Sequence, residues 1–327
     1  MKNRFFTRAS IIFIAGLLCF CSGDIEGNEY PEEMQQFVVD ISTYAKSFSP
    51  YFIIIPQNGA ELVFNGTGRS EGYHEAYINA IDGIGIEELF YNDRGKRIND
   101  KERLLTLKKI KKDHADIQIM VSDFVKNNSA LEESLRLNTE ENSFIAFPRL
   151  NNYDYMEIPS GPITGENNFA INKLSDARNY LYLISPDKFD NKQDMITKIK
   201  ATNYDVVIID MFFIKDDNPT EIFTKADIND INKKPNGEKR LVISYISIGS
   251  LEKFRYYWNE VLNGTRPSWA KKSYDGYPDE YWIQFWNKEW QDIIFGNDNS
   301  YIKKISDAGF DGAYLDNVEA YYFLEND

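Results

Sequence analysis

Histidine and cysteine are scarce in this sequence of 327 residues. It contains two histidines, His74 and His114, and two cysteines, Cys19 and Cys21. Neither histidine follows a predicted strand, so we expect no histidine-based zinc site, no Ser-His-Asp triad and no Cys-His pair. Both cysteines lie near the start of the chain, which excludes a disulfide framework or a cysteine-based metal site from the rest of it. We therefore expect chemistry that uses carboxylates, with no metal and no cofactor.

Basic residues are also few relative to acidic ones. The 37 Lys and Arg residues and 51 Asp and Glu residues give a net charge of −14. Nucleic acids and anionic membrane surfaces bind basic faces, so neither is expected as the main partner. A neutral or cationic ligand suits this charge. The aromatic content of 15% is high, and either an extended core or stacking surfaces for a flat ligand would explain it.

The start of the chain has the form of an export signal. Basic residues precede the apolar run "IIFIAGLLCFC", which is too short to span a bilayer. We expect residues 1–21 to be a signal peptide of lipoprotein type, anchored through Cys21 or Cys19, with plain secretion as the alternative. Residues 22–48 would form a tether and a first helix. The expected location is the periplasm or the cell surface, with membrane contact only through the anchor, and the expected state is a monomer.

Eight short apolar segments recur along the remaining chain, with helix-like stretches between them. They are rich in β-branched and aromatic residues and do not alternate with polar ones, which is typical of parallel strands buried on both faces. The segments span residues 50–59, 80–91, 115–124, 143–150, 179–185, 204–213, 240–250 and 311–321. Helical spacing is clear at 99–112 and 192–203. This pattern predicts an α/β fold of the (β/α)8 TIM-barrel type, with its active site at the carboxyl ends of the strands. A doubly wound open sheet is the alternative, although no glycine-rich phosphate loop follows any strand.

Two segments interrupt this rhythm. Residues 151–177 are polar and contain Pro and Gly, so we interpret them as a linker between half-barrels at 49–150 and 178–327 of a single domain, 49–327. The second is an aromatic-rich insertion between Gly249 and the last strand, and it contains all five tryptophans. These rings would form either a small core for the insertion or platforms for a sugar.

Polar side chains stand where the predicted strands end, and a barrel would bring them to one mouth. They are Gln57, Asn58, Glu87, Glu88, Asp123, Arg149, Asp210, Tyr245, Ser247, Asp316 and Asn317. Two carboxylates without a metal are what glycoside hydrolysis requires: one protonates the leaving oxygen, and the other acts as nucleophile or activates water. Each acid also has a structural alternative. The three aspartates could cap the helices that follow them, and Glu88 could point away from the mouth, because neighbours on a strand face opposite sides.

Three long stretches resemble one known family. They are "VISYISIGSLEKFRYYW" (242–258), "YWIQFWNKEWQDII" (281–294) and "AGFDGAYLDNVEAYYF" (308–323). They resemble the TIM-barrel proteins of glycoside hydrolase family 114, the endo-α-1,4-polygalactosaminidases and their bacterial relatives. "FIIIPQNGAEL" and "AIDGIGIEELFYN" resemble the same family. In its usual arrangement the segment similar to "GFDGAYLDN" is the fourth strand, and those similar to "IIPQNG" and "IEELFY" follow it. Here they precede it, so the chain resembles a circularly permuted member, and its last strand should pair with its first.

The resemblance implies that the catalytic acids are Asp316 and Glu87. We expect substrate-binding side chains at Asp210, Tyr245, Asn58, Arg255, Asn317 and Trp286. The implied function is an exported, endo-acting glycosidase that cleaves an α-linked amino-sugar polysaccharide similar to galactosaminan, a cationic polymer. Ser250 departs from the family, whose members usually have an acidic residue there. This departure favours the alternative, a surface barrel that binds glycans without cleaving them.

Overall fold

The computed structural model describes residues 30–151, 155–215 and 218–324. The predicted signal peptide and both cysteines lie outside these residues. No helix in the described ranges is both long and apolar enough to cross a membrane.

The helix predicted within residues 22–48 is α1 (Tyr30–Phe48). Its apolar residues recur every three or four positions, so one side of the helix is apolar. That side is fully buried in the core, at Met34, Phe37, Val38, Ile41 and Ala45. This helix is therefore part of the folded domain.

All eight predicted strand segments contain a strand. The strands are β1 (Ile53–Pro56), β2 (Gly83–Glu87), β3 (Gln118–Ser122), β5 (Ile145–Ala146), β7 (Tyr180–Tyr182), β8 (Val206–Asp210), β11 (Leu241–Ser247) and β15 (Gly312–Asp316). They form parallel sheets in the orders β7-β8-β11-β15-β1 and β2-β3-β5. A parallel bridge between Gln57 and Gly85 connects the two sheets. Beyond β3 and β5, the short strands β4 (Phe124–Val125) and β6 (Arg149–Leu150) pair in the same sense.

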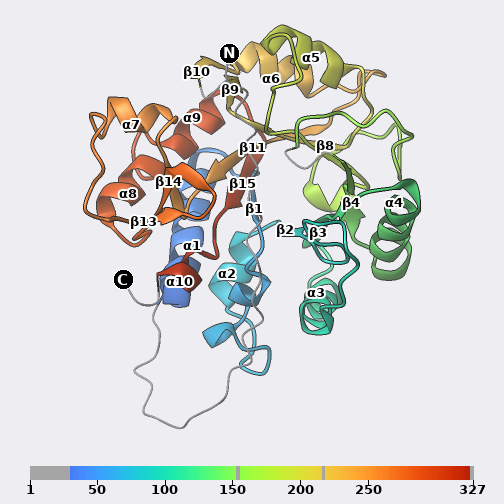
Figure 1. Cartoon of the computed structure of the whole chain (residues 1–327), viewed down its shortest axis with the longest axis horizontal. Coiled ribbons are helices and arrows are strands. Elements are labelled where there is room, and N and C mark those ends of the chain that lie inside the picture. The colour runs from blue at the N-terminus through green and yellow to red at the C-terminus, as the bar shows by residue number, and fades with distance from the viewer. Residues whose placement is uncertain (1–29, 152–154, 216–217, 325–327) are drawn as a thin grey trace.

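The predicted pairing of the last strand with the first is confirmed. The register runs from Gly312 opposite Ile53 to Leu315 opposite Pro56, and Figure 1 shows β15 and β1 side by side in the middle of the molecule. Glycine is needed at 312, because a Cβ atom there would lie 2.3 Å from the Ile53 carbonyl oxygen.

No closed barrel is detected. Within the described ranges, no ladder of hydrogen bonds joins β5 to β7. Across this edge the rings of Phe147 and Tyr180 lie 5.8 Å apart, and the Gln118 side chain donates a hydrogen bond to the Ala177 carbonyl. The fold shown is therefore mixed α/β with parallel sheets.

Helices follow most of the strands. They are α2 (Glu75–Ala80), α3 (Lys101–Asp113), α4 (Asn128–Leu135), α5 (Lys192–Lys200), α6 (Lys225–Ile231), α9 (Tyr301–Asp307) and α10 (Ala320–Phe323), with the short turns η1 (Ala60–Val63), η2 (Asn65–Thr67) and η4 (Leu174–Asp176) and a π-helical turn η3 (Arg136–Glu140). The helices predicted at 99–112 and 192–203 are α3 and α5. Each begins where its sequence supplies a side-chain cap, Asp100 and Asn191 respectively.

The insertion has its own small sheet and an aromatic core. Its elements are β12 (Ser250–Glu252), α7 (Tyr256–Glu260), β13 (Ala270–Tyr274), β14 (Tyr277–Ile283) and α8 (Lys288–Ile294). Outside the insertion, β9 (Phe212–Lys215) and β10 (Asn218–Ile222) form a separate hairpin. Trp290 is fully buried, with its ring centroid 5.6 Å from that of Trp269. Trp282 stacks between Tyr274 and Phe323. These three tryptophans therefore act as core residues of the insertion.

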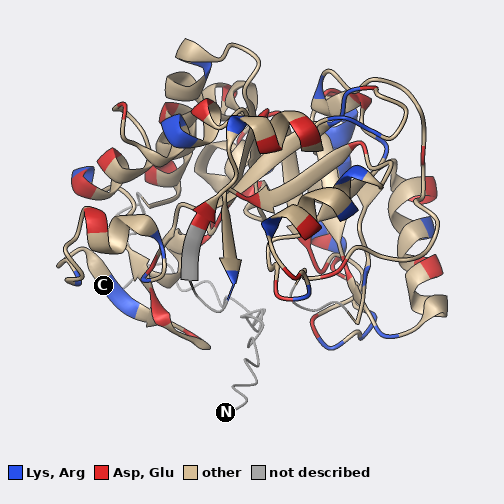
Figure 2. Cartoon of the chain, turned by 90° about the horizontal axis from the view of Figure 1, so that it is seen from above, with Lys and Arg blue, Asp and Glu red and all other residues tan. Residues whose placement is uncertain are grey.

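Charged residues of both signs are distributed over the whole chain. Figure 2 shows Asp and Glu (red) and Lys and Arg (blue) intermingled on helices, strands and loops. The net charge of −14 is thus spread over the molecule.

Candidate active site

Asp316 is the last residue of β15. The Tyr245 hydroxyl, on the neighbouring strand β11, donates a hydrogen bond to Asp316 Oδ2 at 2.5 Å. The backbone N–H of Asn317 donates to Asp316 Oδ1 at 2.8 Å. Burial, and then the nearby negative charge of Glu87, raise the pKa of Asp316 to about 7.

Glu87 is the last residue of β2 and is held from several sides. The Tyr155 hydroxyl donates a hydrogen bond to Glu87 Oε1, and Arg149 Nη1 lies 4.0 Å from the same oxygen. The Glu87 backbone N–H donates to Asn58 Oδ1 at 3.1 Å, and its carbonyl accepts from Arg103 at 2.8 Å. Arg103 also donates to Asn58 Oδ1 at 2.6 Å. The predicted site residue Asn58 therefore orients the end of the strand that carries Glu87.

A single strand, β1, lies between the two acids. Asp316 is level with Gln57 and Gly85 in the strand register, so Glu87 lies two residues farther along its strand. With neighbouring strands about 4.8 Å apart and a rise of about 3.3 Å per residue, the two backbones are separated by roughly 12 Å. Side chains that reach toward each other over this gap fall within the range of about 5 to 10 Å used by glycosidases. The effect of the Glu87 charge on the Asp316 pKa fits such a shared site.

The backbone takes a positive φ angle at the ends of three adjacent strands. Asn58, Glu88 and Asn317 follow or lie next to the ends of β1, β2 and β15, and their φ angles are 62°, 57° and 62°. Asparagine tolerates this left-handed conformation, whereas glutamate adopts it rarely. Such backbone strain often occurs at functional sites.

The turn at Glu88 overturns one expectation. Strand alternation predicted that Glu87 and Glu88 would face opposite sides, but Glu88 leaves the strand conformation. Arg149 Nη1 lies 4.0 Å from Glu87 Oε1, and Arg149 Nη2 lies 4.0 Å from Glu88 Oε1. The two carboxylates therefore share one guanidinium. Burial, and then the charge of Glu87, raise the pKa of Glu88 to about 7.

None of the three aspartates caps a helix. The side-chain caps of α4 and α6 are Asn127 and Thr224, and α10 begins without a side-chain cap hydrogen bond. Asp123 is instead fully buried, where it accepts hydrogen bonds from the Phe90 N–H at 2.9 Å and the Ser134 hydroxyl at 2.7 Å. It therefore fixes the loop after β2 against α4.

Asp210 and Arg255 form a buried ion pair behind Tyr245. They are 4% and 2% exposed, and Arg255 Nη1 donates to Asp210 Oδ2 at 2.5 Å. Arg255 also donates to Glu252 at 2.8 Å and to the Tyr301 hydroxyl at 3.0 Å. Its guanidinium lies 6.0 Å from the centroid of the Tyr245 ring. Both predicted binding residues are thus placed where they support the tyrosine that contacts Asp316.

Ser250 lies beside a carboxylate from another strand. Its hydroxyl donates to Glu280 Oε1, on β14, at 2.5 Å. Asn317 Nδ2 donates to Ser250 Oγ at 3.1 Å and to Ser247 Oγ at 2.9 Å, while its Oδ1 accepts from the Tyr274 hydroxyl at 3.1 Å. Glu280 therefore brings negative charge to the position where the sequence departs from the family.

Trp286 is the predicted site residue that the structure places elsewhere. Its ring stacks on Tyr30 of α1 with centroids 4.6 Å apart, and it packs edge-on against Phe285. None of its ring contacts in the described ranges involves Asp316 or Glu87.

Sequence reasoning missed Tyr155. It lies in the segment interpreted as a linker, where nothing distinguishes it from the neighbouring tyrosine in "NNYDYME". Arg149 was noted as a residue at a strand end, without a role. Among the described residues, no group of three or more His, Cys, Asp or Glu side chains is arranged to hold a metal ion.

Comparison with known proteins supports the family resemblance. Residues 196–327 match the model of Glycoside-hydrolase family GH114. An uncharacterized protein of Methanocaldococcus jannaschii is 30% identical over 162 residues, which is 49% of this chain and 42% of that protein. An uncharacterized protein of Thermotoga maritima is 26% identical over 129 residues, or 38% of this chain and 36% of that protein. The chain thus matches less than half the length of each of these relatives. The match makes residues 196–327 similar to glycoside hydrolase family 114, and it suggests glycoside hydrolase activity.

Proposed function

We propose that this protein is an exported glycoside hydrolase that cleaves an α-linked amino-sugar polysaccharide similar to galactosaminan. The observation that carries the proposal is the placement of Asp316 and Glu87 at the ends of β15 and β2, the two strands that flank β1, and the charge of Glu87 contributes to the raised pKa of Asp316. Two interacting carboxylates in one site are the arrangement that glycoside hydrolysis requires.

In this mechanism one acid protonates the glycosidic oxygen while the other acts as nucleophile or activates water. With a pKa of about 7, Asp316 is present in both protonation states near neutral pH, which suits a group that transfers a proton. The hydroxyl groups of Tyr245 and Tyr155 each hold one of the acids through a hydrogen bond. No cofactor or metal takes part.

The charge around the acids supports a cationic polymer as the substrate and partner. Glu88 adds a carboxylate beside Arg149 near Glu87, and Glu280 adds one beside Ser250, which Asn317 also contacts. A polysaccharide with free amino groups would be attracted by this field, whereas a nucleic acid would be repelled. The alternative of a non-catalytic glycan-binding barrel rested on Ser250, but Glu280 supplies a carboxylate at that position.

We also propose that the parallel strands form a closed, circularly permuted (β/α)8 barrel. The eight strands occur in the order such a barrel requires, and the first and last strands of the chain pair directly. The part of the chain that matches the GH114 model is its carboxyl-terminal part, 196–327. This location fits a chain that begins in the middle of the usual family order.

Export by a lipoprotein route completes the proposal, with a monomer anchored at Cys21 or Cys19. Cells that express the full chain should incorporate labelled palmitate into it. Cys21→Ser and Cys19→Ser, made separately, identify the anchor by loss of label. Release of unlabelled wild-type protein into the medium would favour plain secretion instead.

The substrate is tested by incubating the wild type with deacetylated and acetylated galactosaminan and measuring new reducing ends. We expect release from the deacetylated polymer and slower release from the acetylated one, whose amino groups carry no charge. Binding to either polymer without any release would favour the non-catalytic alternative. If the protein neither binds nor cleaves either polymer, both functions are contradicted.

A further inference from the structure

The segment between the two half-barrels contributes directly to the candidate active site. Its residue Tyr155 is 4% exposed, and the Tyr155 hydroxyl donates a hydrogen bond to Glu87 Oε1. A buried tyrosine hydroxyl directed at a carboxylate restricts the positions that this carboxylate can take.

The Tyr155 ring itself is held firmly. The Arg149 guanidinium lies 4.5 Å from its centroid, and the ring of Tyr182, on β7, lies 4.0 Å from it. The Tyr155 carbonyl accepts a hydrogen bond from the Ser185 backbone N–H at 3.3 Å. The Tyr182 hydroxyl donates to Gln57 Oε1 at 2.9 Å, which connects this group to the end of β1. Tyr155 is therefore fixed between Arg149 of β6 and Tyr182 of β7.

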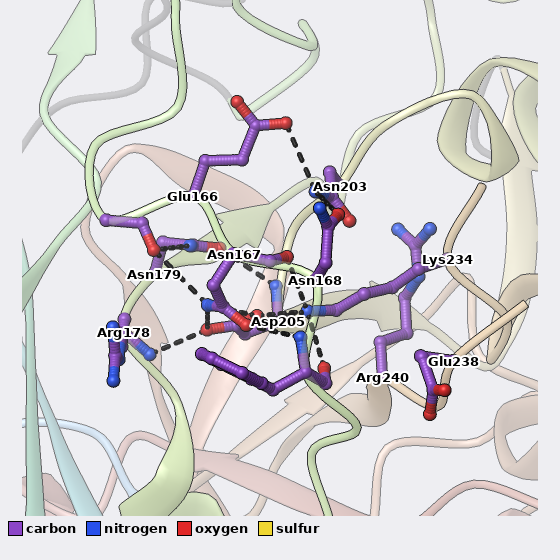
Figure 3. Close-up of polar contacts among 12 residues, drawn as sticks. Glu166, Asn167, Asn168, Arg178, Asn179, Asn203, Asp205, Lys234, Glu238 and Arg240 are labelled. Atoms are coloured by element: carbon purple, nitrogen blue, oxygen red, sulfur yellow. Dashed lines mark hydrogen bonds and ion pairs between the residues drawn. The ribbon is translucent and has the colours of Figure 1, made fainter. Parts of the chain in front are cut away.

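The same segment is anchored at the opposite ends of the strands. Figure 3 shows Asn167 beside Asp205, which precedes β8, and Lys234. The Asn167 side-chain amide donates to both Asp205 oxygens, at 3.0 and 2.8 Å. Lys234 Nζ lies 2.6 Å from Asp205 Oδ1, and both side chains are fully buried. Lys234 Nζ also donates to the carbonyls of Asn167 at 3.2 Å and Phe169 at 3.0 Å. Because breaking a buried pair such as Asp205–Lys234 is costly, these contacts give the segment a stable attachment about ten residues after Tyr155.

We propose that Tyr155 is a positioning residue for Glu87, supplied by the connection between the half-barrels. The proposal rests on the proposed function, because it assumes that Glu87 is one of the two working acids. Tyr155 holds the Glu87 carboxylate through its hydroxyl, while Arg149 lies against both the ring and the carboxylate. The segment that joins the half-barrels is thus a component of the active site as well as a linker.

The test compares Tyr155→Phe with Tyr180→Phe. The two changes are chemically the same and both sites are buried, but the Tyr180 hydroxyl has no hydrogen-bond partner among the described residues. For Tyr155→Phe we expect kcat on deacetylated galactosaminan to fall roughly tenfold, since a hydrogen bond to a charged group is lost. KM should change by less than about twofold, because the change affects the reacting acid more than substrate binding. Tyr180→Phe should keep kcat within about twofold of the wild type. Equal kcat values in both variants, or a change confined to KM, would overturn the proposal.

Crystal structures of the wild type and Tyr155→Phe provide a measurement that does not depend on activity. We expect the wild-type hydroxyl within hydrogen-bond distance of Glu87, and a displaced or disordered Glu87 carboxylate in the variant. A wild-type structure with Tyr155 turned away from Glu87 would overturn the proposal even if the variant fails to fold. An inactive wild type that retains the contact would contradict the proposed function while leaving the positioning contact intact.

Discussion

At the scale of single residues, the site concentrates carboxylates in places that disfavour their charge. The pKa values of Asp316 and Glu88 are raised to about 7, in each case by burial first and by the charge of Glu87 second. Burial, and then the charge of Glu61, raise the pKa of Glu319 to about 8. A carboxyl group whose pKa is higher in the folded state binds more protons there than in the unfolded chain. Its contribution to stability is therefore present at low pH and is lost as the pH rises through the folded-state value.

Glu319→Gln should stabilise the protein at alkaline pH, because it removes a charge that the fold disfavours. At pH 9 we expect a gain of roughly 1 kcal/mol, or about 2 to 4 °C in Tm. At pH 4, where this carboxyl group is largely protonated in both states, the gain should vanish. Thermal unfolding across this pH range measures the difference. Glu132→Gln, an exposed glutamate on α4, is the control and should give no pH-dependent gain. A gain for Glu319→Gln of equal size at pH 4 and pH 9 would contradict the explanation.

Sequence motifs were sufficient to identify the residues at the strand ends, but not to predict how the side chains around them are placed. Asp316 and Glu87 could be named because each ends a buried strand within a long recognisable motif. The direction of the Glu88 side chain could not be predicted, because it depends on a left-handed φ that an alternating strand pattern does not encode. The burial of Arg255 could not be predicted either, because its partners Asp210 and Tyr301 lie 45 and 46 residues away in sequence.

At the scale of elements, the strands were predictable because uninterrupted β-branched runs leave few other possibilities. The insertion was harder to interpret, since tryptophan serves equally well in a core and in a sugar platform. The structure places Trp290 in the core, where its indole N–H donates to the Ile248 carbonyl at 2.8 Å. Trp286 stacks on α1, which no local pattern around it indicates. The connection at 151–177 looked like a linker, and its contacts with both ends of the strands are long-range.

Trp290→Ala should destabilise the insertion strongly, because it removes a fully buried indole and leaves a cavity. We expect a loss of about 3 to 5 kcal/mol in the free energy of unfolding. Trp286→Ala is the matched control. Removal of its partly buried ring should lower the free energy of unfolding by about 2 kcal/mol or less. Chemical denaturation of the two variants gives both values, and a larger loss for Trp286→Ala would contradict the placement of the core.

At the scale of the whole molecule, the pairing of β15 with β1 brings the last strand of the chain next to the first. The site therefore depends on how the strands are arranged in space more than on their order in the sequence. The candidate site takes Asp316 from the last strand of the chain and Glu87 from the second. Sequence comparison predicted this pairing, because the two motifs adjoin each other in the family. It could not predict the interrupted ladder between β5 and β7, which depends on how the connecting segment packs.

A chain restored to the family order should fold. This chain would begin at residue 162, and a flexible linker would join residue 327 to residue 30. We expect a cooperative thermal transition and a far-UV circular dichroism spectrum similar to that of the wild type. The new ends fall beside Gly161, where a Cβ atom would have no neighbour within 4 Å. The comparison is a second design in which the chain is cut at residue 236, between β8 and β11. This cut separates Lys234 from β11. An unfolded chain for the first design would contradict the permutation.

The central claim is that Asp316 and Glu87 are the working acids, and the most direct test measures reducing-end release by wild type, Asp316→Asn and Glu87→Gln. Asp311→Asn is the matched control: Asp311 immediately precedes the same strand, at its opposite end, where it accepts a hydrogen bond from the Val242 N–H at 2.9 Å. We expect a loss of at least about a hundredfold in kcat for both site variants. Asp311→Asn should remain within about threefold of the wild type while folded. Equal rates for the wild type and either site variant would contradict the claim.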